Sequence, residues 1–158
     1  MPSTRPIRLD EWGISWEEYK ELTYFCLQYN QKKRDAAALL TLRLSTPIPA
    51  TYHRAGKEFG TFLPHGSGHV GDPTAATAAR RDRLLRDVRL IERAASEASK
   101  DFNVDPCYIL RAVTTRDGTR KTIAAMGVPI GERQFYNLRR KFFWILREMK
   151  NGELEPAG

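Results

Sequence analysis

Four side chains near the C-terminus have the residue types and the spacing that can read base pairs in duplex DNA. They are Arg133, Tyr136, Asn137 and Arg140. Arginine can form a bidentate pair with guanine and asparagine with adenine, while tyrosine can contact phosphate or the thymine methyl group. Because a helix advances about 100° per residue, all four would lie on one side of it. We therefore expect them to face the major groove as part of a recognition helix.

Basic side chains flank this set in the sequence. Arg120 and Lys121 stand at the start of the preceding helical segment, and Arg139 and Lys141 border the outer face of the last one. Contacts from such residues to phosphates position a protein on duplex DNA without reading its sequence. We expect these four side chains to contact phosphates.

The charge distribution along the chain favours the same kind of partner. Residues 111–150 contain ten basic and three acidic side chains, whereas residues 1–79 contain nine and eight. The net charge of +7 over the 158 residues therefore comes from the C-terminal part. Clustered Lys and Arg are typical of a nucleic-acid-binding module, although a merely solvated basic surface would have the same composition.

The elements expected to hold these residues are a short helix, a turn and a longer basic helix, which is the order of a helix-turn-helix. Asp105-Pro106 predicts the start of a brief helix, and Thr119 can cap the next helix after a turn at 115–118. A last amphipathic helix is expected over 132–150. The alternative is a helical hairpin whose charges are only solvated. The residues expected to anchor the turn and the inner face are Ala125, Val128, Ile130, Phe135, Leu138, Phe142, Ile145 and Met149.

Two long helices are expected upstream of this region. A capping box at 15–18 precedes an apolar stripe that continues, as one long or kinked helix, from about Trp16 to about Leu44. The segment 45–71 is predicted to be a loop or linker, because its density of proline and glycine breaks helices and central strands. Asp72-Pro73 then begins a second long helix, which ends at about Lys100 and packs on the first helix or on a second copy of the chain.

The second long helix has many charged residues outside its apolar stripe. Nearby acidic side chains partly balance its arginines, so the sequence favours a solvated face over a phosphate-binding groove. The arginines are Arg80, Arg81, Arg83, Arg86, Arg89 and Arg93, and the acidic residues are Asp82, Asp87, Glu92 and Glu97.

The remaining reactive residues do not form a catalytic or metal-binding pattern. Cys26 and Cys107 each lie within an apolar helical pattern and are expected to be buried free thiols. All three histidines fall in the 45–71 loop, where His65 and His69 have no third ligand at a fixed spacing. Because no nucleophile with a base and no phosphate-binding loop is evident, we expect a protein that is not an enzyme and uses no metal or cofactor.

Two aromatic residues of the last helix, Phe143 and Trp144, fall outside its predicted core stripe. One interpretation is that the N-terminal helices cover them. The other is that they form a partner-binding surface, because exposed aromatic side chains often anchor interfaces.

Several strings of residues resemble a known family. They are Gly71-Asp72-Pro73-Thr74-Ala75, Ile91-Glu92, Ala112-Val113-Thr114, Arg133-Gln134-Phe135-Tyr136 and Arg139-Arg140-Lys141-Phe142-Phe143. Over about residues 71–147, the chain is similar to small proteins of phages and prophages of low-GC Gram-positive bacteria, related to the RinA and ArpU type of late transcriptional regulators. The resemblance implies a helix-turn-helix similar to region 4 of sigma factors. It also implies sequence-specific control of phage late genes through recruitment or stabilisation of host RNA polymerase.

We therefore predict an all-α protein with two long N-terminal helices, a long Pro/Gly loop between them and a C-terminal basic helix-turn-helix. No apolar run approaches the ~18 residues of a membrane span, and the N-terminus lacks the apolar core of a signal peptide, so we expect a cytoplasmic protein of the bacterial host cell without a membrane partner. The expected parts are an N-terminal helical segment (1–44), the loop (45–71), the long helix packed on the first (72–101), the helix-turn-helix region (102–150) and a tail (151–158).

The expected function is sequence-specific binding of double-stranded DNA by a transcriptional regulator of phage or prophage genes. Host RNA polymerase and a second copy of the chain are the expected protein partners. One alternative is a DNA-packaging protein such as a small terminase subunit, which would form rings. Another is an adaptor that binds only protein and grips the polymerase through Phe143 and Trp144.

Overall fold

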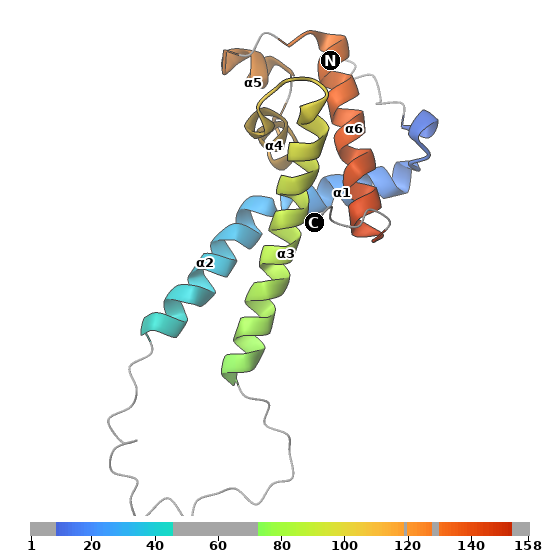
Figure 1. The fold of residues 1–158 in the computed structure, drawn as a ribbon. Coiled ribbons are helices and arrows are strands. Elements are labelled where there is room, and N and C mark those ends of the chain that lie inside the picture. Colours follow the sequence, from blue (N-terminus) through green and yellow to red (C-terminus); the bar gives the residue numbers. More distant parts are fainter. Residues whose placement is uncertain (1–8, 46–72, 119, 128–129, 153–158) are drawn as a thin grey trace, which may run out of the picture.

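The computed structural model describes residues 9–45, 73–118, 120–127 and 130–152, and every regular element in these ranges is a helix (Figure 1). The prediction of an all-α chain is confirmed for this part of the protein. The elements are a 3-10 helix, η1 (Asp10–Trp12), and the α-helices α1 (Trp16–Leu27), α2 (Tyr29–Ser45), α3 (Pro73–Lys100), α4 (Pro106–Thr114), α5 (Arg120–Ala125) and α6 (Glu132–Lys150).

Some predictions fall on residues outside the described ranges. These are the loop after Ser45, the caps Asp72 and Thr119, the turn residue Val128 and the tail after Gly152. Among the helices that are described, none is both long enough and apolar enough to cross a membrane.

The N-terminal helical segment begins where the sequence predicts and is interrupted once. The Ser15 hydroxyl accepts a hydrogen bond from the Glu18 backbone N–H at 3.2 Å, and the Glu18 carboxylate accepts one from the Ser15 N–H at 2.9 Å. The predicted capping box is thus confirmed. α1 ends at Leu27 and α2 begins at Tyr29, so the segment expected to be one long or kinked helix is two helices. Gln28 between them keeps a right-handed conformation (φ −79°, ψ −8°), which changes the chain direction without extending it.

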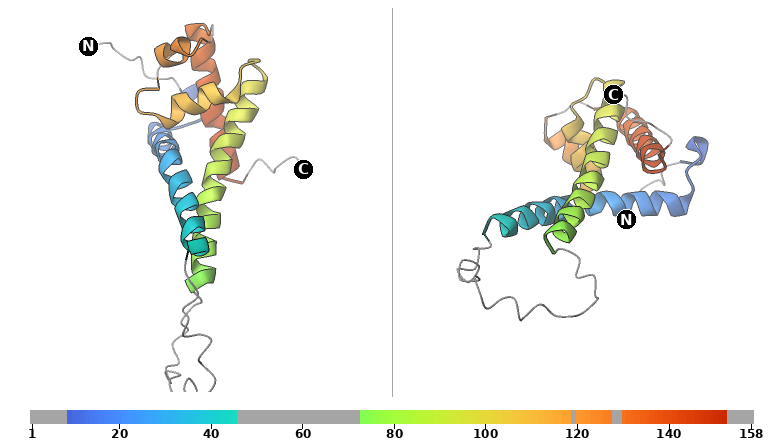
Figure 2. Two further views of the ribbon diagram at one scale, coloured as in Figure 1. Left: turned by 90° about the vertical axis from the view of Figure 1, so that its left-hand side faces the viewer. Right: turned by 60° about the horizontal axis from the view of Figure 1, so that its bottom comes forward.

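α2 and α3 run side by side in opposite directions and form a stem that projects from the other helices (Figures 1 and 2). Ala36 of α2 and Val88 of α3 are buried. The Tyr29 hydroxyl of α2 donates to a Glu92 carboxylate oxygen of α3 at 2.6 Å. Burial and this hydrogen bond raise the pKa of Tyr29 above its ordinary value, so the phenol stays protonated and continues to join the two helices.

The main core lies where the C-terminal half of α3 meets α4 and α6, and α1 closes one side of it. Ala94, Ala95 and Ala98 of α3 are fully buried, and their small side chains let α6 approach closely. α6 contributes most of the large apolar side chains, each of which stabilises the fold by about 1.5–3 kcal/mol when fully buried. Those with almost no exposed surface are Phe135, Leu138, Phe142, Phe143 and Leu146.

Most residues predicted to anchor the C-terminal region are buried, but Ala125 is not. Ile130, Phe135, Leu138, Phe142 and Ile145 lie in the core, and Met149 is half-buried against it. Ala125 was expected where two helices cross, and it is exposed instead. The buried residue of α5 is Ile123, because this helix of six residues turns only one side inward.

The two cysteines occupy different environments, which corrects the expectation that both are buried. Cys26 is fully buried, and this burial raises the pKa of its thiol to about 12. Cys107 is exposed because it stands in the first turn of α4. The N-cap residue Asp105 accepts a hydrogen bond from the Cys107 N–H at 2.8 Å.

We expect one of the two thiols of the native protein to react with a disulfide reagent at about pH 8, because the thiolate is the reacting form and needs access to solvent. Cys107 should react, and Cys26 should react only after unfolding in denaturant. The absorbance of the thiol released from the reagent measures the reaction of Cys107 in the native protein and that of Cys26 after unfolding. A Cys107→Ser variant is the control and should show no native reaction, so rapid native labelling of that variant would contradict the burial of Cys26.

Candidate nucleic-acid interface

Two helices, α5 and α6, hold the residues predicted to contact DNA, and α4 supports both of them. α4 contacts both α5 and α6, and Ile123, Ile130 and Phe135 are buried in one common core. The chain leaves α4 through a tight turn in which Gly118 lies directly against that helix. A Cβ atom on Gly118 would be only 1.9 Å from the Ala112 carbonyl oxygen. A glycine turn and three apolar anchors therefore position α5 and α6 relative to α4.

The N-terminal half of α6 contains the four predicted base-reading residues. Arg133 is exposed, and Tyr136, Asn137 and Arg140 are half-buried. Arg140 donates from Nη1 to the Asn137 side-chain oxygen at 3.0 Å, so these two side chains lie together. The Tyr136 ring packs against Phe135 with the ring centroids 5.5 Å apart. Arg133 is thus the most accessible of the four, and the structure brings Asn137 and Arg140 into direct contact.

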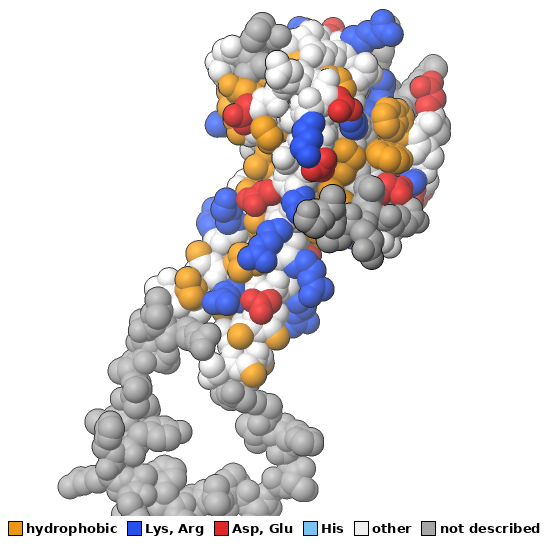
Figure 3. All heavy atoms as spheres, viewed as in Figure 1, with side chains coloured by type: hydrophobic (Ala, Val, Ile, Leu, Met, Phe, Trp, Pro, Cys, Tyr) orange, Lys and Arg blue, Asp and Glu red, His pale blue; other side chains and the backbone are white. Residues whose placement is uncertain are grey.

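Two of the predicted phosphate contacts lie at the start of α5. Lys121 is exposed and Arg120 is half-buried. No acidic side chain in the described ranges forms an ion pair with either of them. Both cations can therefore meet an anionic partner. Basic side chains also gather along the stem (Figure 3).

Neighbouring elements engage Arg139 and Lys141, the two residues predicted to reach phosphates from the borders of the outer face of α6. Arg139 donates from Nη2 to the Tyr19 hydroxyl of α1 at 3.3 Å, and its guanidinium carbon lies 5.7 Å from the centre of the Phe143 ring. Lys141 forms an ion pair with Asp101, just after α3. These two cations join α6 to the rest of the fold.

The prediction of a partner-binding surface is also wrong for Phe143, which has no exposed surface. Its ring meets those of Tyr19 and Phe142 edge-on, at centroid distances of 5.0 Å and 5.2 Å. The other interpretation, cover by the N-terminal helices, is confirmed for this residue. Trp144 is half-buried, with its ring centroid 6.1 Å from that of Trp12 in η1.

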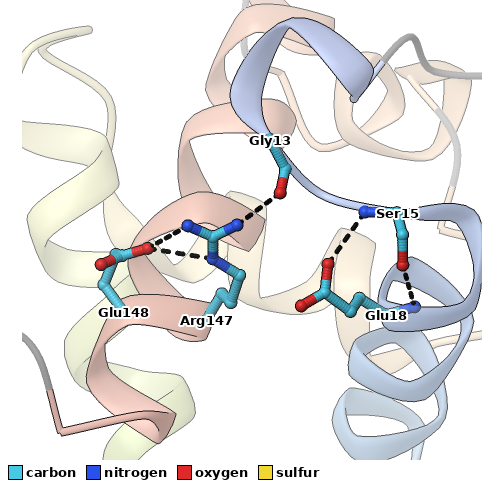
Figure 4. A network of polar contacts seen from close by, with 5 residues as sticks. All are labelled: Gly13, Ser15, Glu18, Arg147 and Glu148. Carbon is cyan, nitrogen blue, oxygen red and sulfur yellow. Dashed lines mark hydrogen bonds and ion pairs between the residues drawn. The ribbon is translucent and has the colours of Figure 1, made fainter.

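The N-terminal segment also covers the second half of the outer face of α6 (Figure 4). Arg147 donates from Nη1 to the Gly13 carbonyl oxygen at 2.5 Å and from Nε to a Glu148 carboxylate oxygen at 2.9 Å. Gly13 has φ +66°, a conformation that glycine adopts without strain, and its carbonyl group points at α6 (Figure 4). The part of the outer face left for a partner is therefore the N-terminal half of the helix.

The sequence does not reveal two contacts that shape this interface. Tyr19 holds Arg139 away from the outer face, and Gly118 allows the turn to approach Ala112. The signal for the glycine is the Asp117-Gly118 dipeptide, which is typical of a turn. The signal for Tyr19 is the aromatic stripe of α1, which needs large apolar partners.

The described residues contain no group of three or more His, Cys, Asp or Glu side chains placed to hold a metal ion. All three histidines, including His65 and His69, lie outside these residues. Comparison with protein-family models, with curated proteins and with solved structures finds no match to this chain.

Proposed function

We propose that this protein binds double-stranded DNA through the N-terminal half of α6 and regulates transcription of phage or prophage genes. The observation that carries the proposal is the part of the outer face of α6 that none of the other described elements covers. It presents an exposed arginine, Arg133, together with the hydrogen-bonded pair Arg140 and Asn137. These are the side chains that make bidentate contacts with guanine and adenine.

The preceding helix supplies the complementary phosphate contacts. Arg120 and Lys121 begin α5, which is held on α4 by the same core that holds α6. In a helix-turn-helix, the first of the two helices lies across the backbone while the second enters the major groove. Arg139 and Lys141 are engaged in contacts within the protein, with Tyr19 and Asp101. The phosphate contacts of α5 and α6 therefore come from fewer cations than the sequence suggests.

The resemblance to the RinA and ArpU type of regulators supports the regulatory part of the proposal. It points to host RNA polymerase as the protein partner and to the bacterial cytoplasm as the place of action. Phe143 is not the surface that contacts the polymerase, because it is buried. The partners proposed are double-stranded DNA, the polymerase and, for paired half-sites, a second copy of the chain.

The proposal is tested by selecting bound sequences from a randomised duplex library and measuring the dissociation constant of the best site by fluorescence anisotropy. Arg133→Ala and Arg140→Ala should each weaken binding to that site by about 1–3 kcal/mol, because each would lose a bidentate base contact. Binding to random DNA should change much less. Lys20→Ala removes an exposed cation of α1 and is the matched control.

Unchanged affinity in both arginine variants would contradict the assignment of this face. The molar mass of the same sample, from light scattering, separates a regulator from its main rival. A monomer or dimer fits a regulator, whereas a ring-sized oligomer would indicate a DNA-packaging protein.

A further inference from the structure

The stem carries a second group of arginines, on the outward side of α3. Their side chains are exposed, and they follow one another at spacings of three, three and four residues, within an arc of about 120° around the helix. From the sequence alone, four acidic residues of the same helix partly balance these charges. The outward arginines are Arg83, Arg86, Arg89 and Arg93.

Two of those acidic residues are directed to α2. An Asp87 carboxylate oxygen lies 2.6 Å from the Lys32 ammonium nitrogen. Glu92 accepts a hydrogen bond from the Tyr29 hydroxyl at 2.6 Å and lies 3.5 Å from the Lys33 ammonium nitrogen. Both carboxylates therefore neutralise cations of the neighbouring helix.

The other two acidic residues have partners of their own on α3. Asp82 lies 3.5 Å from the guanidinium of Arg81, and Glu97 lies 2.7 Å from the ammonium of Lys100. No ion pair within the described ranges involves any of the four outward arginines. Asp87 and Glu92 are turned toward α2, and of the four acidic residues only Asp82 and Glu97 share the outward face with the arginines. The face therefore keeps an excess of positive charge.

The spacing and residue type of this row fit a phosphate backbone. Steps of three and four residues raise successive side chains by about 4.5–6 Å along a helix, a distance comparable with that between neighbouring phosphates. All four are arginines, whose planar guanidinium binds phosphate oxygens in a bidentate manner. Basic side chains gather over the stem in Figure 3, and Figure 1 shows that the stem leads away from the N-terminal end of α6.

We propose that the outward face of α3 is a second, sequence-independent surface for the backbone of duplex DNA. It contacts phosphates away from the site that α6 reads, and it adds affinity without adding base selectivity. The inference rests on the proposed function for its partner, duplex DNA, but it uses different residues.

The test is the salt dependence of binding to a labelled random-sequence duplex. Here K is the association constant for DNA. In Arg86→Gln/Arg93→Gln, the magnitude of the negative slope of log K against log salt concentration should decrease by about two, because each lost phosphate contact removes about 0.9. Lys20→Gln/Arg34→Gln removes the same charge from exposed positions off this row and should keep the wild-type slope. Circular dichroism confirms that both variants are folded.

The outcomes separate the two proposals. An unchanged slope in the α3 variant would overturn this inference, and it is the result expected if an acidic protein occupies the face. If Arg133→Ala still weakens the selected site in that case, the proposed function stands alone. If the slope falls but Arg133→Ala and Arg140→Ala have no effect, the α3 surface is supported and the α6 assignment fails. Absence of DNA binding by the wild-type chain would overturn both.

Discussion

Gly118→Ala is expected to destabilise the protein by at least about 3 kcal/mol, because the new methyl group would overlap backbone atoms of α4. Its Cβ atom would lie 1.9 Å from the Ala112 carbonyl oxygen and 2.5 Å from the carbonyl carbon. Neither atom can move without shifting the helix or the turn. In a chain of this size, each kcal/mol lowers the midpoint of thermal unfolding by about 2–4 °C.

Thermal and urea unfolding followed by circular dichroism measure this effect. Gly131→Ala is the matched control, because no atom lies within 4 Å of a Cβ atom built on Gly131. That variant should differ from wild type by less than about 1 kcal/mol. Wild-type stability in Gly118→Ala would mean that the turn does not approach α4 in solution, and the placement of α5 would then be wrong.

Phe143→Ala is expected to cost about 3–5 kcal/mol of unfolding free energy, since it removes a fully buried ring and leaves a cavity. The ring also meets Tyr19 and Phe142 edge-on and lies below the Arg139 guanidinium. Loss of the ring therefore weakens the contact of α1 with α6 as well as the core.

The comparison variant is Tyr24→Ala, whose side chain is 66% exposed on α1. It should remain within about 0.5 kcal/mol of wild type in urea unfolding. If Phe143→Ala were as stable as Tyr24→Ala, Phe143 would be a surface residue. It would then be available to bind the polymerase, as the adaptor hypothesis requires.

The positions of the helices follow from local signals that the sequence contains. The capping box at 15–18 and the Asp105-Pro106 start act within one turn of chain, so they can be read without knowledge of the fold. The interruption at Gln28 has no such signal, because no proline or glycine marks it. It is evident only once α2 and α1 are seen to pack on different partners, α3 for one and α4 and α6 for the other.

The burial of α6 shows a second limit of sequence reasoning. A single apolar stripe predicts one inner face, and Phe135, Leu138 and Phe142 do lie on it. The buried surface of α6 is wider than this stripe and includes Phe143, because α1 packs there as well. Periodicity within one helix cannot say how many neighbours that helix has.

Charge is where sequence and structure differ most for the candidate site. Composition counts cations, but only the fold decides which of them already have a partner. Arg139 and Lys141 look available in the sequence and are engaged with Tyr19 and Asp101. The arginines of α3 look partly balanced in the sequence, but two of the acidic residues on that helix contact α2 instead.

The contact between Arg147 and the Gly13 carbonyl has a thermodynamic consequence for recognition. Together with α1 and η1, it fixes the C-terminal half of α6, so the exposed N-terminal half projects from a rigid support. A helix that is already ordered loses little conformational entropy on association. The free energy of its contacts can then contribute directly to DNA affinity and to discrimination between DNA sequences, because no part of it is needed to order α6 on binding.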